Sequence, residues 1–204
     1  MNPLSKDCLS AARAAVVANA KFLLSDAHIL LNEQSSGRGY ALSVLAREEM
    51  GKLAMLIRAS YAVKGNEAFD WPRLRRRMLS HSEKLRASAL VQIVHSTNLL
   101  GVSDVKTELR RRLQEPTYQQ LLNVGKQGGL YVEVSDRGIM SPSDVSAREA
   151  WEVYHRARTL FVFFDSGEET DPESHFMGIQ DFYGKVICLT EDLIEAPDSV
   201  TLPR

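Results

Sequence analysis

The segment LAREEMGKLAMLIR, residues 45–58, combines an apolar helical stripe with charged side chains, and this combination constrains how the chain can fold. On a helix with 100° per residue, Glu49 lies near the middle of the stripe, in register with Leu42 and Leu56. A carboxylate in apolar surroundings is unfavourable unless a cation or hydrogen-bond donor pairs with it. The segment therefore predicts a helix whose Glu49 faces a polar partner on another helix. The other members of the stripe are Leu45, Ala46, Leu53 and Ile57.

The rest of the chain reads as further helices with one short hairpin. We expect an all-α fold, an up-and-down helical bundle with a small β-hairpin insertion at about 124–142, formed by a single domain over residues 1–204. Glycines in NEQSSGRG, residues 32–39, indicate a turn between the first two helices. Helices are expected over about 5–33, 40–63, 70–101, 103–115, from Pro116, from Ser141 through 147–164, and over 176–194.

Composition narrows the classes of partner and cofactor. Hydrophobic residues make up 44% and charged residues 25%, and the net charge of −1 provides no global basic field, so any nucleic-acid surface is local. Cys8 and Cys188 lack metal-ligand spacing and are expected to be buried thiols in a reducing cytoplasm. No apolar run reaches the roughly 18 residues of a membrane span, and no signal peptide is expected at the start of the sequence. We expect a soluble cytoplasmic protein without metal, cofactor or membrane partner.

The helix expected over 70–101 carries a second set of polar residues. His81 shares a face with apolar residues of that helix, and Lys84 follows it by one turn. Because the connecting loop is short, we expect Glu49 and Lys52 to approach His81 and an arginine. Such a cluster has a structural interpretation, in which it fixes helix register. It also has a chemical one, in which a histidine moves a proton and arginines hold a phosphate during metal-free RNA cleavage by a ribose 2′-hydroxyl.

Three motifs resemble those of the AbiV family of abortive infection proteins. LAREEMGK resembles A-x-E-E-x-G-K, HSEK resembles H-x-x-K, and KQGGLYVEV resembles K-x-x-G-L-Y-V-D/E, in the same order over residues 46–134. The resemblance implies a bacterial anti-phage protein of the HEPN superfamily, whose members are helical bundles that usually dimerise. It also implies that the protein shuts down translation after infection and that a phage protein triggers it.

Many HEPN proteins are ribonucleases with an R-x4-6-H motif, and both Arg75 and Arg76 have this spacing to His81. Arg77 departs from the Asn, Asp or His that often follows the motif arginine. On an unbroken helix Arg76 would point about 140° away from His81, whereas Arg77 would share its face. Three alternatives follow: the helix is irregular around Leu79–Ser80, Arg77 is the partner, or there is no nuclease. The candidate catalytic residues are His81, Arg76, Arg77 and Glu49, and the candidate RNA or phosphate contacts are Arg75, Lys52 and Lys84.

The sequence is consistent with three candidate functions. The first is an RNA-cleaving, translation-blocking toxin, in which a homodimer brings two His81–arginine centres together around one RNA strand. The second is a non-catalytic interaction module that binds a phage protein or the translation machinery, with a purely structural cluster. The third is a nucleotide-binding accessory domain. Residues 110–114 (RRRLQ) are expected to be a solvated face, His155 a packed histidine, and the hairpin a flap or an edge for a partner strand.

Overall fold

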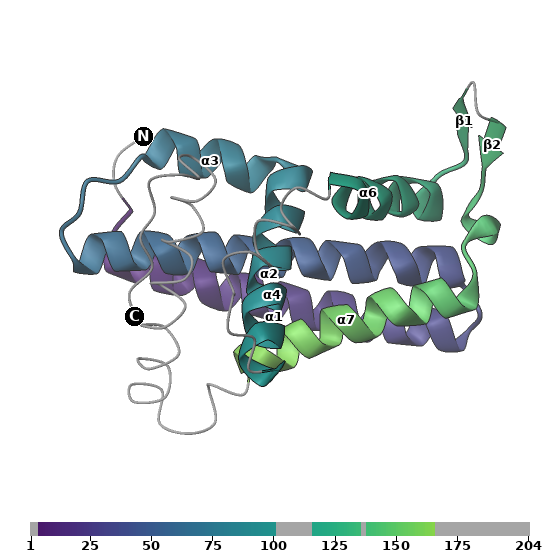
Figure 1. Cartoon of the computed structure of the whole chain (residues 1–204), viewed down its shortest axis with the longest axis horizontal. Coiled ribbons are helices and arrows are strands. Elements are labelled where there is room, and N and C mark those ends of the chain that lie inside the picture. Colours follow the sequence, from purple (N-terminus) through teal and green to yellow (C-terminus); the bar gives the residue numbers. More distant parts are fainter. Residues whose placement is uncertain (1–3, 101–115, 136–137, 166–204) are drawn as a thin grey trace.

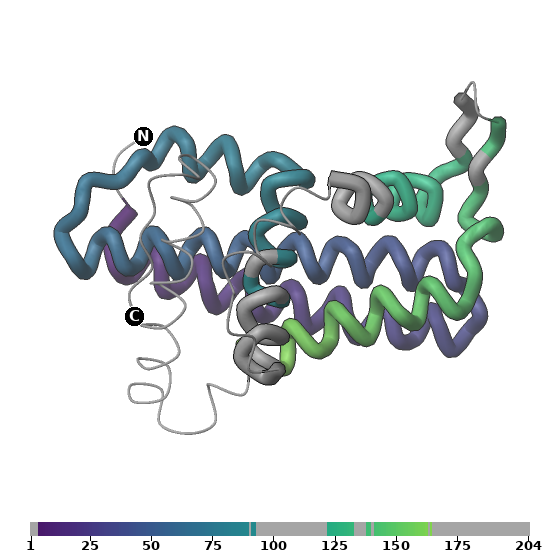
Figure 2. The backbone as a smooth tube through the Cα atoms, in the orientation of Figure 1, coloured from purple at the N-terminus to yellow at the C-terminus, as the bar shows by residue number. Residues whose placement is uncertain are grey.

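The structure is a computed structural model that describes residues 4–100, 116–135 and 138–165. These residues form a bundle of helices with one short hairpin at its end (Figure 1). Helix α2 runs through the middle of the bundle and contacts α1, α4, α6 and α7. The backbone tube in Figure 2 shows the two longest helices and α7 running side by side. The expected helical fold is confirmed.

Helices α1 (Lys6–Asn32) and α2 (Ser36–Lys64) form a long antiparallel pair joined by a short turn. Helix α1 agrees with its expected span, but α2 begins before its expected start at Tyr40. Gly37 was expected to break the chain and instead lies buried in the first turn of α2. A Cβ at Gly37 would lie 2.3 Å from the carbonyl oxygen of Pro142, so this glycine permits close packing rather than a turn.

The expectation of one continuous helix over 70–101 was wrong, because the chain forms two helices, α3 (Trp71–Leu79) and α4 (His81–Leu100). Ser80 between them has an extended backbone, with φ −84° and ψ 121°. Its Oγ accepts a hydrogen bond from the backbone N–H of Glu83 at 3.4 Å. Ser-x-x-Glu is a known helix N-terminal sequence, so this stretch contained the signal for a new helix. As a result, α3 lies along α2 whereas α4 turns and crosses it (Figure 1).

Helix α6 (Pro116–Leu130) leads into a hairpin of two antiparallel strands, β1 (Glu133–Ser135) and β2 (Gly138–Met140). Glu133 pairs with Met140 at the open end and Ser135 with Gly138 next to the turn. Gly138 has φ +117°, a conformation that glycine adopts without strain. The expected hairpin is therefore present but shorter than 124–142, because its first seven residues, 124–130, continue α6.

The chain returns to the bundle through a 3-10 turn, η1 (Pro142–Asp144), and helix α7 (Ala147–Asp165). The segment from Ser141 was expected to begin this helix directly, but its capping box closes on η1. Ser146 then caps α7, its Oγ accepting from the backbone N–H of Glu149 at 3.2 Å. The helices expected over 103–115 and 176–194, the patch at 110–114, and Cys188 lie outside the described residues.

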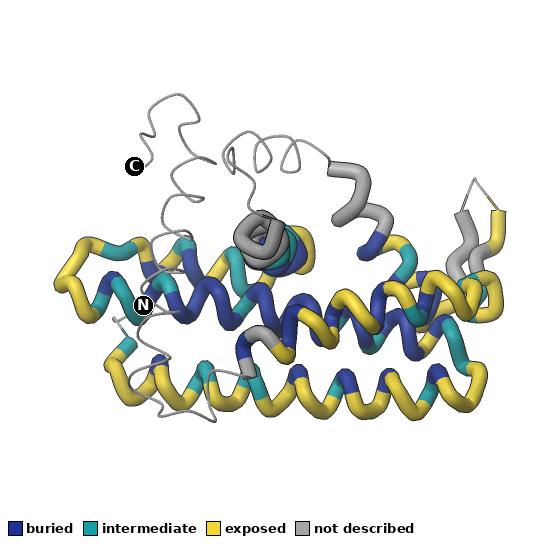
Figure 3. Tube along the Cα trace, turned by 60° about the horizontal axis from the view of Figure 1, so that its bottom comes forward, coloured by how far each residue is buried: buried dark blue, intermediate teal, exposed yellow. Residues whose placement is uncertain are grey.

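The core surrounds α2 on several sides, as the burial pattern in Figure 3 shows. Val44, Leu53 and Ile57 of α2 pack with Leu24 of α1 and Phe161 of α7 in the main hydrophobic cluster. A smaller cluster packs α3 against α1 and α2, and includes Leu9, Leu56, Trp71 and Leu74. Because neighbours lie on several sides, α2 has no single inward stripe. Polar residues outside the expected stripe are therefore buried as well.

Helix α1 differs from expectation in two respects. Its most apolar 18-residue window has a mean hydropathy of 1.4, so by length and composition alone it is long and apolar enough to cross a membrane. The core helix of a soluble protein passes the same test, and α1 packs Leu24, Ala27 and Leu31 into the bundle. Cys8 is exposed near the start of α1, so the expectation that it is buried was wrong. Cys8 lies on the solvent side of the first turn, whereas the next residue, Leu9, is buried.

Candidate functional site

The Glu48 carboxylate lies at the centre of a cluster of cationic side chains. His81 Nδ1 is 2.6 Å and Lys84 Nζ 2.7 Å from Glu48 Oε2, and Lys126 Nζ is 2.7 Å from Glu48 Oε1. Only 2% of the Glu48 side chain is exposed. These are short, charge-assisted contacts of the kind that hold a carboxylate inside a protein. We refer to these four residues as the Glu48 cluster.

Close packing between α2 and α4 brings His81 and Lys84 of the cluster to Glu48. A Cβ at Gly51 would lie 1.9 Å from the carbonyl oxygen of Lys84, so α4 can cross α2 here only because residue 51 is glycine. Since α4 begins at His81, its first turn presents His81 and Lys84 to the same part of α2. Glu48 lies one turn before Gly51 and therefore meets both side chains.

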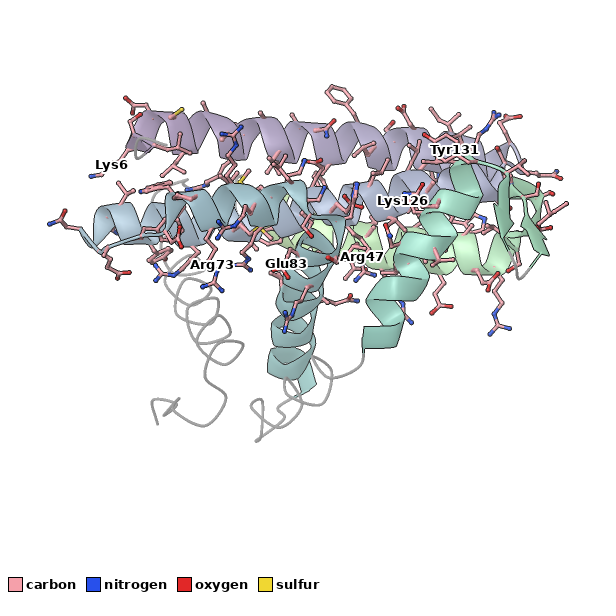
Figure 4. The ribbon with its side chains drawn as sticks, turned by 90° about the horizontal axis from the view of Figure 1, so that it is seen from above. Lys6, Arg47, Arg73, Glu83, Lys126 and Tyr131 are labelled. Atoms are coloured by element: carbon pink, nitrogen blue, oxygen red, sulfur yellow. The ribbon has the colours of Figure 1, made fainter. Side chains whose placement is uncertain are left out.

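Helix α6 supplies the last member of the cluster. Figure 4 shows α4 and α6 on the same side of α2, opposite α1, with Lys126 on α6. The Lys126 side chain is 2% exposed. Arg47, the residue before Glu48, is also buried and donates to Gln92 of α4 at 2.9 Å. The site is thus built from α2, the start of α4 and the second half of α6.

The electrostatics of the cluster favour an ionised Glu48. Burial by itself would raise the pKa of Glu48, but hydrogen bonds from Lys126, Lys84 and His81 outweigh burial and hold the pKa below its ordinary value of 4.5. One carboxylate thus faces two ammonium groups and an imidazole. The cluster therefore carries an excess of positive charge, which an additional anion would neutralise.

His81 is held at Nδ1, and about half of its side chain is exposed. A carboxylate only accepts, so we assign the proton to Nδ1, which donates to Glu48 at 2.6 Å; Lys126 Nζ is then a charged neighbour of Nδ1 and not its hydrogen-bond donor. In this tautomer the lone pair is at Nε2, the arrangement that a carboxylate enforces on a histidine acting as a base. The His81 side chain is 51% exposed, so it is accessible to a substrate. Lys126 Nζ lies 3.1 Å from Nδ1 and adds a second charge next to the ring.

The expectation that Glu49 pairs with His81 was wrong. Glu49 accepts from Lys52 Nζ at 2.6 Å, and this pair is separate from the Glu48 cluster. The two glutamates are about 100° apart around α2. Helix α4 crosses α2 on the side of Glu48, whereas the apolar stripe around Glu49 was expected to face His81. The structure thus brings His81 and Lys84 together and leaves Glu49 and Lys52 as a neighbouring ion pair.

The three candidate arginines lie on α3, before the break at Ser80. Arg77 Nε donates to Glu83 at 3.1 Å, and this ion pair bridges the break between α3 and α4. Arg75 and Arg76 are exposed. Of the three sequence alternatives, the irregular helix is the one that the structure shows.

Sequence reasoning missed Glu48 and Lys126 as members of the site. Both residues lie in the motifs that resemble the AbiV family: Glu48 is the first glutamate of LAREEMGK, and Lys126 is the first residue of KQGGLYVEV. Their buried contact spans 78 positions of the chain. Helical spacing cannot predict a contact between such distant segments, so the motif positions were the only available signal.

The other two histidines whose side chains the structure describes, His28 and His155, do not form a comparable site. His155 stacks on Trp151 with ring centroids 5.5 Å apart, and the exposed His28 lies 5.6 Å from the Tyr154 ring. The side chain of His95 is outside the described residues. In the part of the chain that the structure describes, no three His, Cys, Asp or Glu side chains gather as a metal site would require.

The fold and the comparisons together assign the protein to a family. A helical bundle with these elements is a HEPN-type helical fold. The family model for AbiV matches residues 9–161, which is most of the chain and includes the whole Glu48 cluster. The chain belongs to the AbiV family, and this membership indicates a role in abortive infection. Comparisons with curated proteins and with solved structures give no match.

Proposed function

We propose that the protein is a HEPN-type, metal-independent endoribonuclease that acts as a toxin in abortive infection. The observation that carries this proposal is the pair of Glu48 and His81, in which the carboxylate holds Nδ1 while the ring remains 51% exposed. A histidine oriented in this way can transfer a proton at Nε2. The excess positive charge of the cluster favours a bound phosphate.

The proposed reaction uses the ribose 2′-hydroxyl next to the cleaved bond. His81 Nε2 takes the proton of that hydroxyl, and the 2′-oxygen attacks the phosphorus. The bond from phosphorus to the 5′-oxygen breaks, and the resulting imidazolium returns the proton to this oxygen. The products are a 2′,3′-cyclic phosphate and a 5′-hydroxyl, and Glu48 stabilises the imidazolium between the two transfers.

The cations divide into two groups in this proposal. Lys84 and Lys126 are almost completely buried, so they act on the charge around Glu48 and His81. Arg75 and Arg76 are exposed on α3 and are available to contact the RNA backbone. Arg77 is engaged with Glu83 and is more suited to holding α3 and α4 together.

The proposal extends to the setting in which the toxin acts. We place it in the cytoplasm, as a homodimer that cleaves RNA and blocks translation once a phage protein has triggered it. Family membership supports this setting. A two-fold interface that brought two Glu48 clusters together would double the positive charge around one RNA strand.

The proposal is tested by incubating purified protein with total bacterial RNA in chelator, with and without extract from phage-infected cells. We expect cleavage that depends on the infected extract and products that end in a 2′,3′-cyclic phosphate. His81→Ala removes the proton carrier and is expected to abolish both cleavage and protection against phage. If RNA stays intact while His81→Ala still loses protection, the site matters but nuclease chemistry is wrong.

A second candidate function is a non-catalytic interaction module. The burial of three of the four cluster residues favours it, because a closed network of Glu48, Lys84 and Lys126 is suited to fixing the register of three helices. This function predicts that His81→Ala affects phage protection only in proportion to its loss of folded protein. Thermal melts alongside phage plating separate the two candidates.

A further inference from the structure

A cavity of about 300 Å³ lies beside α3, and the proposed function does not use it. We call it the α3 cavity. It is lined mainly by hydrocarbon and aromatic surface, with two cations, Lys52 and Arg75. Its volume is at the lower end of small-molecule sites, which suits a single ring system better than a large ligand. The apolar lining residues are Leu4, Trp71, Leu74, Met78 and Leu79.

The α3 cavity adjoins the Glu48 cluster along both α2 and α3. Lys52 follows Glu48 by four positions on α2, so their Cβ atoms are about 5–6 Å apart. Leu79 precedes His81 by two residues, is 72% exposed, and marks the end of α3 next to the cluster. A polymer that places one phosphate at His81 therefore brings its neighbouring unit to the cavity.

The charges at the cavity suit a ligand with both an apolar ring and an anionic group. Lys52 donates one hydrogen bond to Glu49 at 2.6 Å, and its ammonium group has two further N–H donors for another acceptor. Arg75 is exposed, and among the described residues it has no ion pair. A simple acyl chain would leave these donors unused, and a free phosphate would leave the apolar wall uncovered. A nucleotide satisfies both.

We propose that the α3 cavity binds one unstacked base of single-stranded RNA, adjacent to the phosphate at His81, with Arg75 and Lys52 contacting the phosphate of that nucleotide. The inference rests on the proposed function and names its substrate class: unpaired RNA rather than duplex. Proteins that read single-stranded RNA bury splayed bases against aromatic and apolar side chains in this way. In a duplex the base is stacked and cannot enter.

The experiment uses Trp71 as its own reporter. The chain has two tryptophans, so Trp151→Phe leaves Trp71 as the single fluorophore. The variant is titrated with a 2′-O-methyl trinucleotide, which has no 2′-hydroxyl to attack, with its abasic analogue of equal charge, and with decanoate. We expect saturable quenching by the trinucleotide and binding about tenfold weaker or worse for the abasic analogue. If Trp151→Phe does not fold, the difference between wild type and Trp71→Phe gives the same signal.

A substitution tests whether Arg75 holds the phosphate. Arg75→Ala is expected to weaken trinucleotide binding about tenfold. Arg158→Ala, the same change at an exposed position of α7, is the matched control and is expected to bind as the parent does.

Several results overturn the inference. Equal binding of the abasic analogue means that only phosphates are recognised, and equal quenching by decanoate means that the cavity takes an acyl chain. The absence of any Trp71 response while the wild type cleaves RNA refutes base binding and leaves the proposed function standing. Base-dependent quenching by a protein that never cleaves RNA refutes the nuclease and leaves base binding at the cavity.

Discussion

Replacing Glu48 by glutamine is the sharpest perturbation of this protein, because it removes one charge and almost no volume. The Glu48 carboxylate accepts from His81, Lys84 and Lys126 at 2.6–2.7 Å. The glutamine amide keeps one acceptor oxygen, places an N–H₂ group against another donor, and leaves two buried ammonium groups without a counter-charge. Breaking a buried ion pair from one side costs about 3–5 kcal/mol.

The adjacent glutamate provides a matched control. Glu49 has the same chemistry on the same helix, but its ion pair is only partly buried: the side chain of Glu49 is 11% exposed and that of its partner Lys52 is 25% exposed. Solvent reaches this pair through Lys52, so Glu49→Gln should cost about 1 kcal/mol, well below the cost of Glu48→Gln. In a chain of this size 1 kcal/mol shifts the melting temperature by about 2–4 °C, so Glu48→Gln is expected to lower it by roughly 6–20 °C. Circular dichroism melts and urea midpoints at neutral pH measure both variants.

Two outcomes would contradict this prediction. Equal losses of stability for Glu48→Gln and Glu49→Gln would mean that the Glu48 cluster is not a buried charge network. A Glu48→Gln variant as stable as wild type would mean that Lys84 and Lys126 reach other acceptors or water. In either case Glu48 would not be the residue that orients His81.

Three further predictions concern the same cluster. Because the folded-state pKa of Glu48 is lowered, its stabilising effect is complete above the ordinary value of 4.5 and declines as pH falls through the folded-state pKa. Urea midpoints at about pH 7 and about pH 3 should therefore differ less for Glu48→Gln than for wild type. Gly51→Ala places a methyl group against the Lys84 carbonyl and should lower the free energy of unfolding by at least about 1–3 kcal/mol in thermal melts. Gly65→Ala is the control and should cost little, because its Cβ would first meet a flexible side chain at 3.2 Å. His81→Ala should cost only about 1–2 kcal/mol, since the lysines still satisfy Glu48, yet abolish RNA cleavage; a large melting-temperature loss would contradict this and favour the structural function.

Much of the fold could be predicted from the sequence, because local patterns act within a helix. The spans of α1 and α7 follow from apolar periodicity, and the hairpin follows from alternation around a glycine turn. The break at Ser80 was also predictable from its capping sequence, although periodicity suggested a continuous helix. The start of α2 was not, since a glycine such as Gly37 signals either a turn or a close contact, and the choice depends on what packs against it.

The candidate site, like the fold, was predictable from the sequence only in part. The sequence by itself determined that His81 and Lys84 share one turn, and that a polar cluster must accompany the carboxylates of α2, because helical spacing and the cost of a buried charge are local rules. Only the tertiary structure decided that Glu48 rather than Glu49 is the centre, and that Lys126 completes it. Helical periodicity relates the faces of one helix to each other, but which face a neighbouring helix covers depends on where the two can approach. Here that place is Gly51, where the absence of a side chain lets α4 rest on α2.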